Sequence, residues 1–169
     1  EIMPSLVGSE MCIRDSRCSL YLSGCPFHCP GCYNVAAQNF HYGQPYSQEL
    51  EDQIIEDLGQ DYVQGLTLLG GEPFLNTQVG IRMCERIRSE FGNTKDIWSW
   101  SGYTWEELQQ DSEDKLKMLS LIDILVDGRF LQDKMDLSLQ FRGSSNQRII
   151  DVPKSLTAGK VVIWDKLVK

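Results

Sequence analysis

An alternation of short apolar runs with longer amphipathic segments constrains the fold of this chain more than any other feature. Apolar runs that are predicted as buried strands occupy residues 17–23, 65–69, 96–100 and 122–126. Between them, apolar side chains recur at helical spacing at residues 47–58, 76–91 and 104–119. Strands that alternate with helices are typical of βα units. The sequence therefore predicts an α/β fold with a mostly parallel sheet.

Local signals place the helix starts. Ser47 is predicted to cap the first helix and Asn76 the second. Thr104 and Glu107 have the spacing of a capping box at the start of the third, which is expected to run to about residue 119. Residues 148–152 and 160–164 are candidates for closing strands, joined as a hairpin around residues 158–159.

Length and composition indicate one soluble domain. The chain has 169 residues, of which 41% are hydrophobic, and its formal net charge is −8. The negative charge argues against non-specific binding of nucleic acid or of an anionic membrane. We see no run long enough to span a membrane and no secretory leader. Three of six cysteines crowd into one loop, which favours a metal or cluster site in a reducing, cytoplasmic compartment over a disulfide framework.

The first sixteen residues form the least coherent part of the sequence. They show no amphipathic period and do not begin with Met. They look like vector- or adapter-derived sequence fused to a truncated reading frame. We therefore expect residues 1–16 to be an artefactual segment and residues 17–169 to be a single domain.

Polar or glycine-rich turns follow all four predicted strands. In mostly parallel sheets, ligands bind at the carboxyl ends of the strands. The four turns should therefore gather on one rim and form the site. They are the cysteine loop at 23–34 and the turns at 70–73, 99–102 and 127–129.

The cysteine loop holds Cys25, Cys29 and Cys32 in a C-x-x-x-C-x-x-C pattern. Soft thiolate ligands select zinc, copper or iron–sulfur clusters. Structural zinc usually has four protein ligands, whereas three thiolates leave one position of a [4Fe–4S] cluster open for another ligand. The alternative is a structural zinc site that uses His28 or His41 as its fourth ligand.

The other turns offer charged groups to a ligand on the same rim. Glu72 can bind an ammonium group through a charge-assisted hydrogen bond. Asp127 and Arg129 form either a surface ion pair or part of the site. The segment at 141–148 contains two arginines and can bind a carboxylate, a phosphate or the backbone of a partner.

Several motifs together resemble one protein family. The triple-cysteine pattern followed by Gly-Gly-Glu-Pro at 70–73 resembles the radical S-adenosylmethionine (SAM) superfamily. The segments at 32–34, 100–108, 126–130 and 141–148 narrow the resemblance to the activating enzymes of anaerobic (class III) ribonucleoside-triphosphate reductases. The resemblance covers residues 17 to 169. It implies an incomplete (βα) barrel with an open, curved, mostly parallel sheet.

The resemblance also implies a reaction. A [4Fe–4S] cluster on Cys25, Cys29 and Cys32 would bind SAM and receive an electron from a flavodoxin-type donor. Reductive cleavage would release methionine and a 5′-deoxyadenosyl radical. That radical would take a hydrogen atom from a glycine of the large reductase subunit, its protein substrate, and leave a glycyl radical.

Further site residues follow by position in the motifs. Glu72 would bind the methionine ammonium group, and Ser99 and Ser101 would lie near the ribose or methionine. The full predicted cofactor-binding set is Tyr33, Asn34, Gly70, Gly71, Glu72, Pro73, Ser99, Ser101, Asp127, Arg129, Asn146 and Arg148. One departure is Gly31, which occupies the position where many superfamily members carry an aromatic residue that packs on adenine.

Three alternatives remain open at this point. The target could be another glycyl-radical enzyme or a small molecule. The short chain leaves little room for a dedicated substrate pocket, which favours a protein substrate. From a different class, the chain could be a non-catalytic zinc module that binds a partner.

Overall fold

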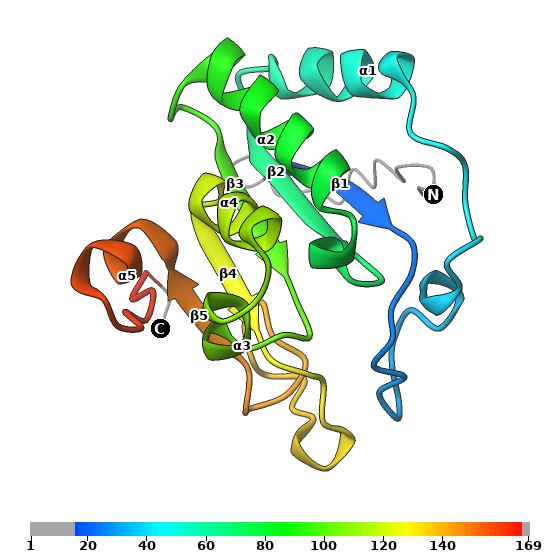
Figure 1. The fold of residues 1–169 in the computed structure, drawn as a ribbon, viewed down its shortest axis with the longest axis vertical. Coiled ribbons are helices and arrows are strands. Elements are labelled where there is room, and N and C mark those ends of the chain that lie inside the picture. The colour runs from blue at the N-terminus through cyan, green and yellow to red at the C-terminus, as the bar shows by residue number, and fades with distance from the viewer. Residues whose placement is uncertain (1–15, 167–169) are drawn as a thin grey trace.

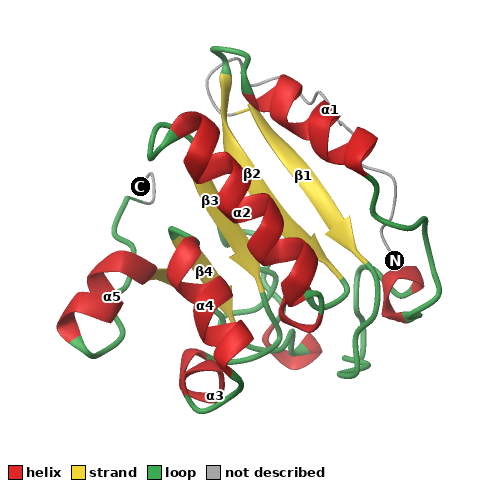
Figure 2. Ribbon diagram, turned by 45° about the horizontal axis from the view of Figure 1, so that its top comes forward, coloured by secondary structure: helices red, strands yellow, loops and turns green. Residues whose placement is uncertain are grey.

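A five-stranded open sheet organises the computed structural model, which describes residues 16–166. The strands follow each other in chain order across the sheet (Figures 1 and 2). The first four pair in parallel, and the last runs antiparallel to its neighbour. The predicted α/β fold with a mostly parallel sheet is confirmed. The strands are β1 (Ser16–Leu22), β2 (Val63–Gly70), β3 (Asp96–Trp100), β4 (Ile124–Asp127) and β5 (Arg148–Asp151).

Helices lie against one face of this sheet, where α2 and α4 cross in front of the strands in Figures 1 and 2 and α1 lies beside β1 in Figure 2. The α-helices are α1 (Gln48–Leu58), α2 (Thr77–Phe91), α3 (Trp105–Gln109), α4 (Glu113–Leu121) and α5 (Val152–Ala158). The short 3₁₀ helices are η1 (Ala36–Gln38), η2 (Pro73–Leu75) and η3 (Gln132–Lys134). Ser47 and the Thr104–Glu107 capping box begin α1 and α3 as predicted.

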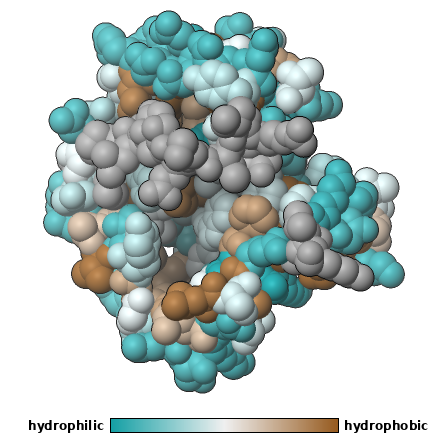
Figure 3. Space-filling model, turned by 180° about the vertical axis from the view of Figure 1, so that it is seen from behind, coloured by the Kyte–Doolittle hydropathy of each residue, from teal (hydrophilic) through white to brown (hydrophobic). Residues whose placement is uncertain are grey.

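The two faces of the sheet carry different side chains. Leu20 on β1 pairs in register with Leu68 on β2, and Leu68 pairs with Ser99 on β3, so these three side chains share the face that packs on the helices. Alternation places Trp98 and Trp100 on the opposite face. There, Trp98 packs with a smaller buried cluster formed by Ile124, Val126 and Ile149. Figure 3 shows the molecule from behind, where a hollow opens beside hydrophobic side chains.

The predicted helix from 104 to 119 is wrong in one respect, because it is two helices. The Asp111 carboxylate accepts a hydrogen bond from the Ser112 amide and pairs with Lys115. Short polar side chains compete with the helical ladder in this way, and the chain turns before α4 begins at Glu113.

The predicted C-terminal hairpin is also wrong. Asp151 ends β5 and caps α5 through a hydrogen bond from the Lys154 amide, with Pro153 in the first turn. Gly159 ends that helix in a left-handed conformation. The segment after it makes only an isolated bridge, between Ile163 and Ile150, and not a strand.

The expectation of an artefactual segment at 1–16 falls outside the described residues, except for Ser16, the first residue of β1. Within residues 16–166, no helix has the length and apolarity needed to cross a membrane.

Candidate functional site

Backbone hydrogen bonds join the four turns at the carboxyl ends of β1 to β4 in two pairs. The Gly71 amide donates to the Leu22 carbonyl at 2.6 Å, and the Glu72 amide donates to the Gly24 carbonyl at 2.8 Å. On the other side, the Ser101 amide donates to the carbonyl of Val126 at 2.9 Å. The prediction that these turns share one rim is confirmed.

The cysteine loop is held at its start by the segment around η1. The Gly24 and Cys25 amides donate to the carbonyls of Ala37 and Gln38 at 2.7 and 3.1 Å. At the apex of the loop, His28 has a positive φ of 45°, and its Nδ1 lies 2.9 Å from the Gln38 side-chain oxygen. This contact orients the His28 ring through Nδ1.

The three cysteines of this loop are free thiols, each half-buried. Burial raises the pKa of Cys25, the nearby Glu72, Cys29 and Cys32 raise it further, and a hydrogen bond from the Phe27 backbone lowers it. Soft sulfur donors grouped in one loop suit iron–sulfur clusters. Within residues 16–166, no three His, Cys, Asp or Glu side chains are already placed to hold a single metal ion.

The Gly70-Gly71 pair allows the cysteine loop to lie close to the end of β2. A Cβ atom on Gly71 would lie 2.5 Å from the Gly24 carbonyl oxygen and 2.6 Å from that of Ala37. Gly70 has a φ of 114°, a conformation that other residues rarely adopt. The two glycines therefore let β2 end directly against the loop, with Pro73 beginning η2 behind them.

Glu72 is fully buried, and both of its carboxylate oxygens have partners within the protein. Oε1 accepts from the Phe74 amide at 3.0 Å and from the Ser101 hydroxyl at 2.8 Å. Oε2 accepts from the Gly102 amide at 2.7 Å. Burial raises the pKa of Glu72 to about 7, against the effect of these donors. The carboxylate thus links the ends of β2 and β3.

Glu72→Gln is expected to change the pH dependence of stability. Because the folded-state pKa of Glu72 is about 7 against a usual 4.5, the folded state holds this proton more tightly than the unfolded state. Stability is therefore highest below pH 4.5 and falls as the pH rises to 7, by about 3 kcal/mol for this group. Urea unfolding of both proteins between pH 5 and 8, under reducing conditions, should show a shallower decline in the Gln variant. Parallel curves would contradict the burial argument.

Two other predicted cofactor residues lie toward the helices. Ser99 is fully buried on the helix-covered face, and its hydroxyl has no partner among the described residues. Asp127 is 1% exposed and accepts from the Trp105 amide at 2.8 Å and from Arg148 Nε at 3.0 Å. Arg148 also pairs with Glu106 at 2.8 Å. These carboxylates raise the pKa of Arg148, Asp127 foremost.

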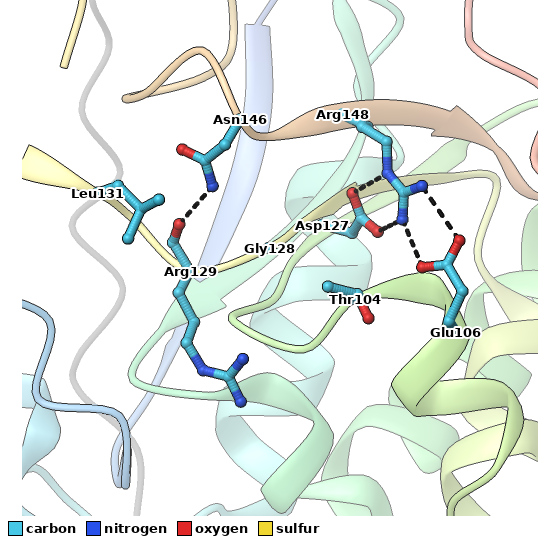
Figure 4. Close-up of a pocket in the computed structure, with 8 residues that line it drawn as sticks. All are labelled: Thr104, Glu106, Asp127, Gly128, Arg129, Leu131, Asn146 and Arg148. Carbon is cyan, nitrogen blue, oxygen red and sulfur yellow. Dashed lines mark hydrogen bonds and ion pairs between the residues drawn. The ribbon is translucent and has the colours of Figure 1, made fainter. Parts of the chain in front are cut away.

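A cavity of about 520 Å³ opens beside this ion pair (Figure 4). Its wall includes Arg129 and Asn146, whose side-chain amide donates to the Arg129 carbonyl at 2.9 Å. The Asn146 side-chain oxygen is buried without a partner among the described residues. Asp127, Arg129, Asn146 and Arg148 are therefore brought together. Tyr33 is 94% exposed, and neither it nor the half-buried Asn34 lines this cavity.

Sequence reasoning missed Phe27 and Tyr103, whose rings meet edge to face at 4.9 Å. Phe27 lies between two cysteines of the motif, and Tyr103 lies in the β3–α3 turn. No periodicity or spacing in the sequence distinguishes these aromatic residues from others in loops.

Comparison with known proteins gives consistent matches. A family profile described as a 4Fe-4S single cluster domain matches residues 14–150, which supports an iron–sulfur cluster in this chain. The anaerobic ribonucleoside-triphosphate reductase-activating protein of Escherichia coli (strain K12) is 44% identical over 136 residues, which cover 78% of this chain and 86% of that protein.

Two relatives of the same name extend the comparison. The protein of Pasteurella multocida (strain Pm70) is 44% identical over 138 residues, with 79% of this chain and 86% of that protein covered. The protein of Enterobacteria phage T4 is 33% identical over 135 residues, with 79% and 82% covered. This chain belongs to the family of anaerobic ribonucleoside-triphosphate reductase-activating proteins.

Proposed function

We propose that this chain activates an anaerobic ribonucleoside-triphosphate reductase as a radical SAM enzyme. The observation that carries the proposal is the cysteine loop, with three free half-buried thiols at the carboxyl end of β1 and hydrogen bonds to the next turn. The relatives named as activating proteins indicate the partner. The open, mostly parallel sheet supports an incomplete barrel of the radical SAM type.

The proposed chemistry needs one electron. Passed through a [4Fe–4S] cluster, it would cleave SAM into methionine and a 5′-deoxyadenosyl radical, which would take a hydrogen atom from a glycine of the large reductase subunit. A flavodoxin-type protein of the cytoplasm is the proposed donor. Cluster potentials extend to about −700 mV, so a strongly reducing centre is physically reasonable.

The residues of this chain are proposed to bind the cluster and SAM and to orient them. Cys25, Cys29 and Cys32 are the proposed cluster ligands, and three thiolates for four irons would leave one iron open to SAM. Gly70 and Gly71 set the distance between this loop and the end of β2.

The predicted cofactor residues fall into two groups. Tyr33 and Arg129 are exposed and Asn34 and Asn146 are half-buried. All four are proposed to contact the cofactor or the reductase directly. Glu72, Ser101, Asp127 and Arg148 are bonded within the protein, and their proposed contribution includes holding the rim turns. Pro73 and Ser99 complete the proposed set.

The test uses anaerobic protein reconstituted with iron and sulfide. Reduction in the presence of SAM should yield 5′-deoxyadenosine, and mixing with the reductase should give a glycyl-radical signal in electron paramagnetic resonance (EPR). A chain that binds zinc alone and shows no cluster absorbance after reconstitution would refute the proposal. Cleavage of SAM without a glycyl signal would refute the partner and leave the radical chemistry standing.

A further inference from the structure

Phe27 connects the cysteine loop to the turn between β3 and α3. It lies between Cys25 and Cys29, and it is half-buried while its neighbours Pro26 and His28 are exposed. Its ring packs edge to face on Tyr103, with centroids 4.9 Å apart at 78°. A Cβ atom on Gly102 would lie 2.4 Å from the Phe27 ring, so only glycine admits the ring at this depth.

Arg129 also packs on this ring. Its guanidinium carbon lies 4.4 Å from the Phe27 centroid. Both terminal nitrogens of Arg129 donate to Glu107 Oε1 at 3.2 Å, while Glu107 Oε2 accepts from the Thr104 amide in the capping box. The first turn of α3 therefore fixes the guanidinium over the ring.

The contact continues beyond Tyr103 into α4. Lys115 Nζ lies 4.6 Å from the Tyr103 centroid and pairs with Asp111 at 2.8 Å. The two rings of Phe27 and Tyr103 thus pack on each other, with the cation of Arg129 against the first and that of Lys115 against the second. The whole series ties a residue between two cysteines to the helix layer. Ring pairs and cation–π contacts of this kind are together worth about a factor of ten in an equilibrium constant.

We propose that Phe27 is a positioning residue for the cluster ligands, held in place by its contacts with Arg129 and with the β3–α3 turn. It acts through Cys25 and Cys29 by holding the loop between them against the rim. The inference rests on the iron–sulfur cluster of the proposed function, and no role of Phe27 in SAM binding is needed for it.

The experiment compares Phe27→Ala, Phe27→Tyr and Arg129→Gln with a control, Tyr62→Ala. Phe27→Tyr keeps the ring face. Tyr62 is an exposed aromatic residue, 56% accessible, directly before β2 and so at the end of the strands opposite the rim. Thermal unfolding establishes that each variant is folded.

In the cluster-free chain, hydrogen–deuterium exchange of residues 24–34 should be about tenfold faster in Phe27→Ala than in the parent. Arg129→Gln should give a smaller increase, and Phe27→Tyr and Tyr62→Ala should match the parent. In the reconstituted chain, Phe27→Ala should lose iron to a chelator faster and give a broadened EPR spectrum of the reduced cluster, with both properties restored in Phe27→Tyr.

Unchanged exchange, iron loss and EPR spectrum in a folded Phe27→Ala variant would overturn the proposal. A parent chain that takes up no cluster would refute the proposed function instead, and the exchange measurement would still decide whether Phe27 anchors the loop. Equal defects in Phe27→Ala and Phe27→Tyr would also overturn the proposal, because they would exclude the ring face as the cause.

Discussion

Cys29→Ala is expected to reduce 5′-deoxyadenosine formation to the level of a cluster-free sample. A [4Fe–4S] cluster that has only three protein ligands cannot lose one of them without exposing a second iron to solvent and chelators. Cys29 lies at the centre of the motif, and its carbonyl accepts the Cys32 amide at 3.0 Å, so the backbone of the loop survives the substitution. The measurements are the iron content, the cluster absorbance and 5′-deoxyadenosine formation after anaerobic reconstitution.

Cys18→Ala is the matched control for this experiment. Cys18 is 6% exposed on β1 and faces the helices, and burial raises its pKa to about 11, so it remains a protonated thiol at neutral pH. This variant should keep its iron and its activity. Loss of the cluster in both variants would show that iron content follows general stability, and retention of the cluster in Cys29→Ala would contradict the ligand assignment.

Asp127→Ala is expected to lower the free energy of unfolding by about 3 kcal/mol. The substitution leaves the Trp105 amide at the start of α3 without its acceptor and removes the buried partner of Arg148. Arg148 is 34% exposed, so water compensates part of the loss, and the expected cost lies at the low end for a broken buried pair. Urea unfolding at neutral pH under reducing conditions measures it.

Glu106→Gln measures separately how much the second partner of Arg148 contributes to stability. Glu106 is 57% exposed, and pairs of this kind contribute less than about 1 kcal/mol. The predicted order is therefore a large loss for Asp127→Ala and a small one for Glu106→Gln. Equal losses would show that the ion pair with Arg148, and not the buried acceptor for α3, determines the effect.

The elements that sequence analysis located correctly are those with strong local signals. The apolar runs became β1 to β4, and the Thr104–Glu107 capping box begins α3 as expected. The errors at 110–112 and 152–158 arose where polar side chains and prolines interrupt or begin helices by contacts that periodicity does not report. These contacts are made by the side chains of Asp111 and Asp151, which accept hydrogen bonds from backbone amides close in sequence. Other local hydrogen bonds were equally available to these residues, so the sequence alone does not select them.

The site was predicted at the level of turns but not of side chains. Strand order brings the cysteine loop and the Glu72 turn to one rim, and this follows from the parallel topology alone. The strand Asp-Ile-Trp-Ser-Trp alternates between the two faces of the sheet. The structure places Ile97 and Ser99 on the face that meets the helices, and Trp98 and Trp100 on the opposite face. Which phase of an alternating strand meets the helices depends on packing partners that lie far away in sequence.

The anchoring of the cysteine loop has a consequence for the portability of this motif. A synthetic peptide of residues 23–34 would carry all three thiols, yet it would lack Tyr103, Arg129 and the backbone of η1. Such a peptide would have to organise its own ligands at the expense of chain entropy. Transplanting the motif into another scaffold therefore requires a glycine against which the Phe27 ring can pack, as well as the three cysteines. In this protein, the conformation of the three-cysteine loop depends on the turns assembled around it.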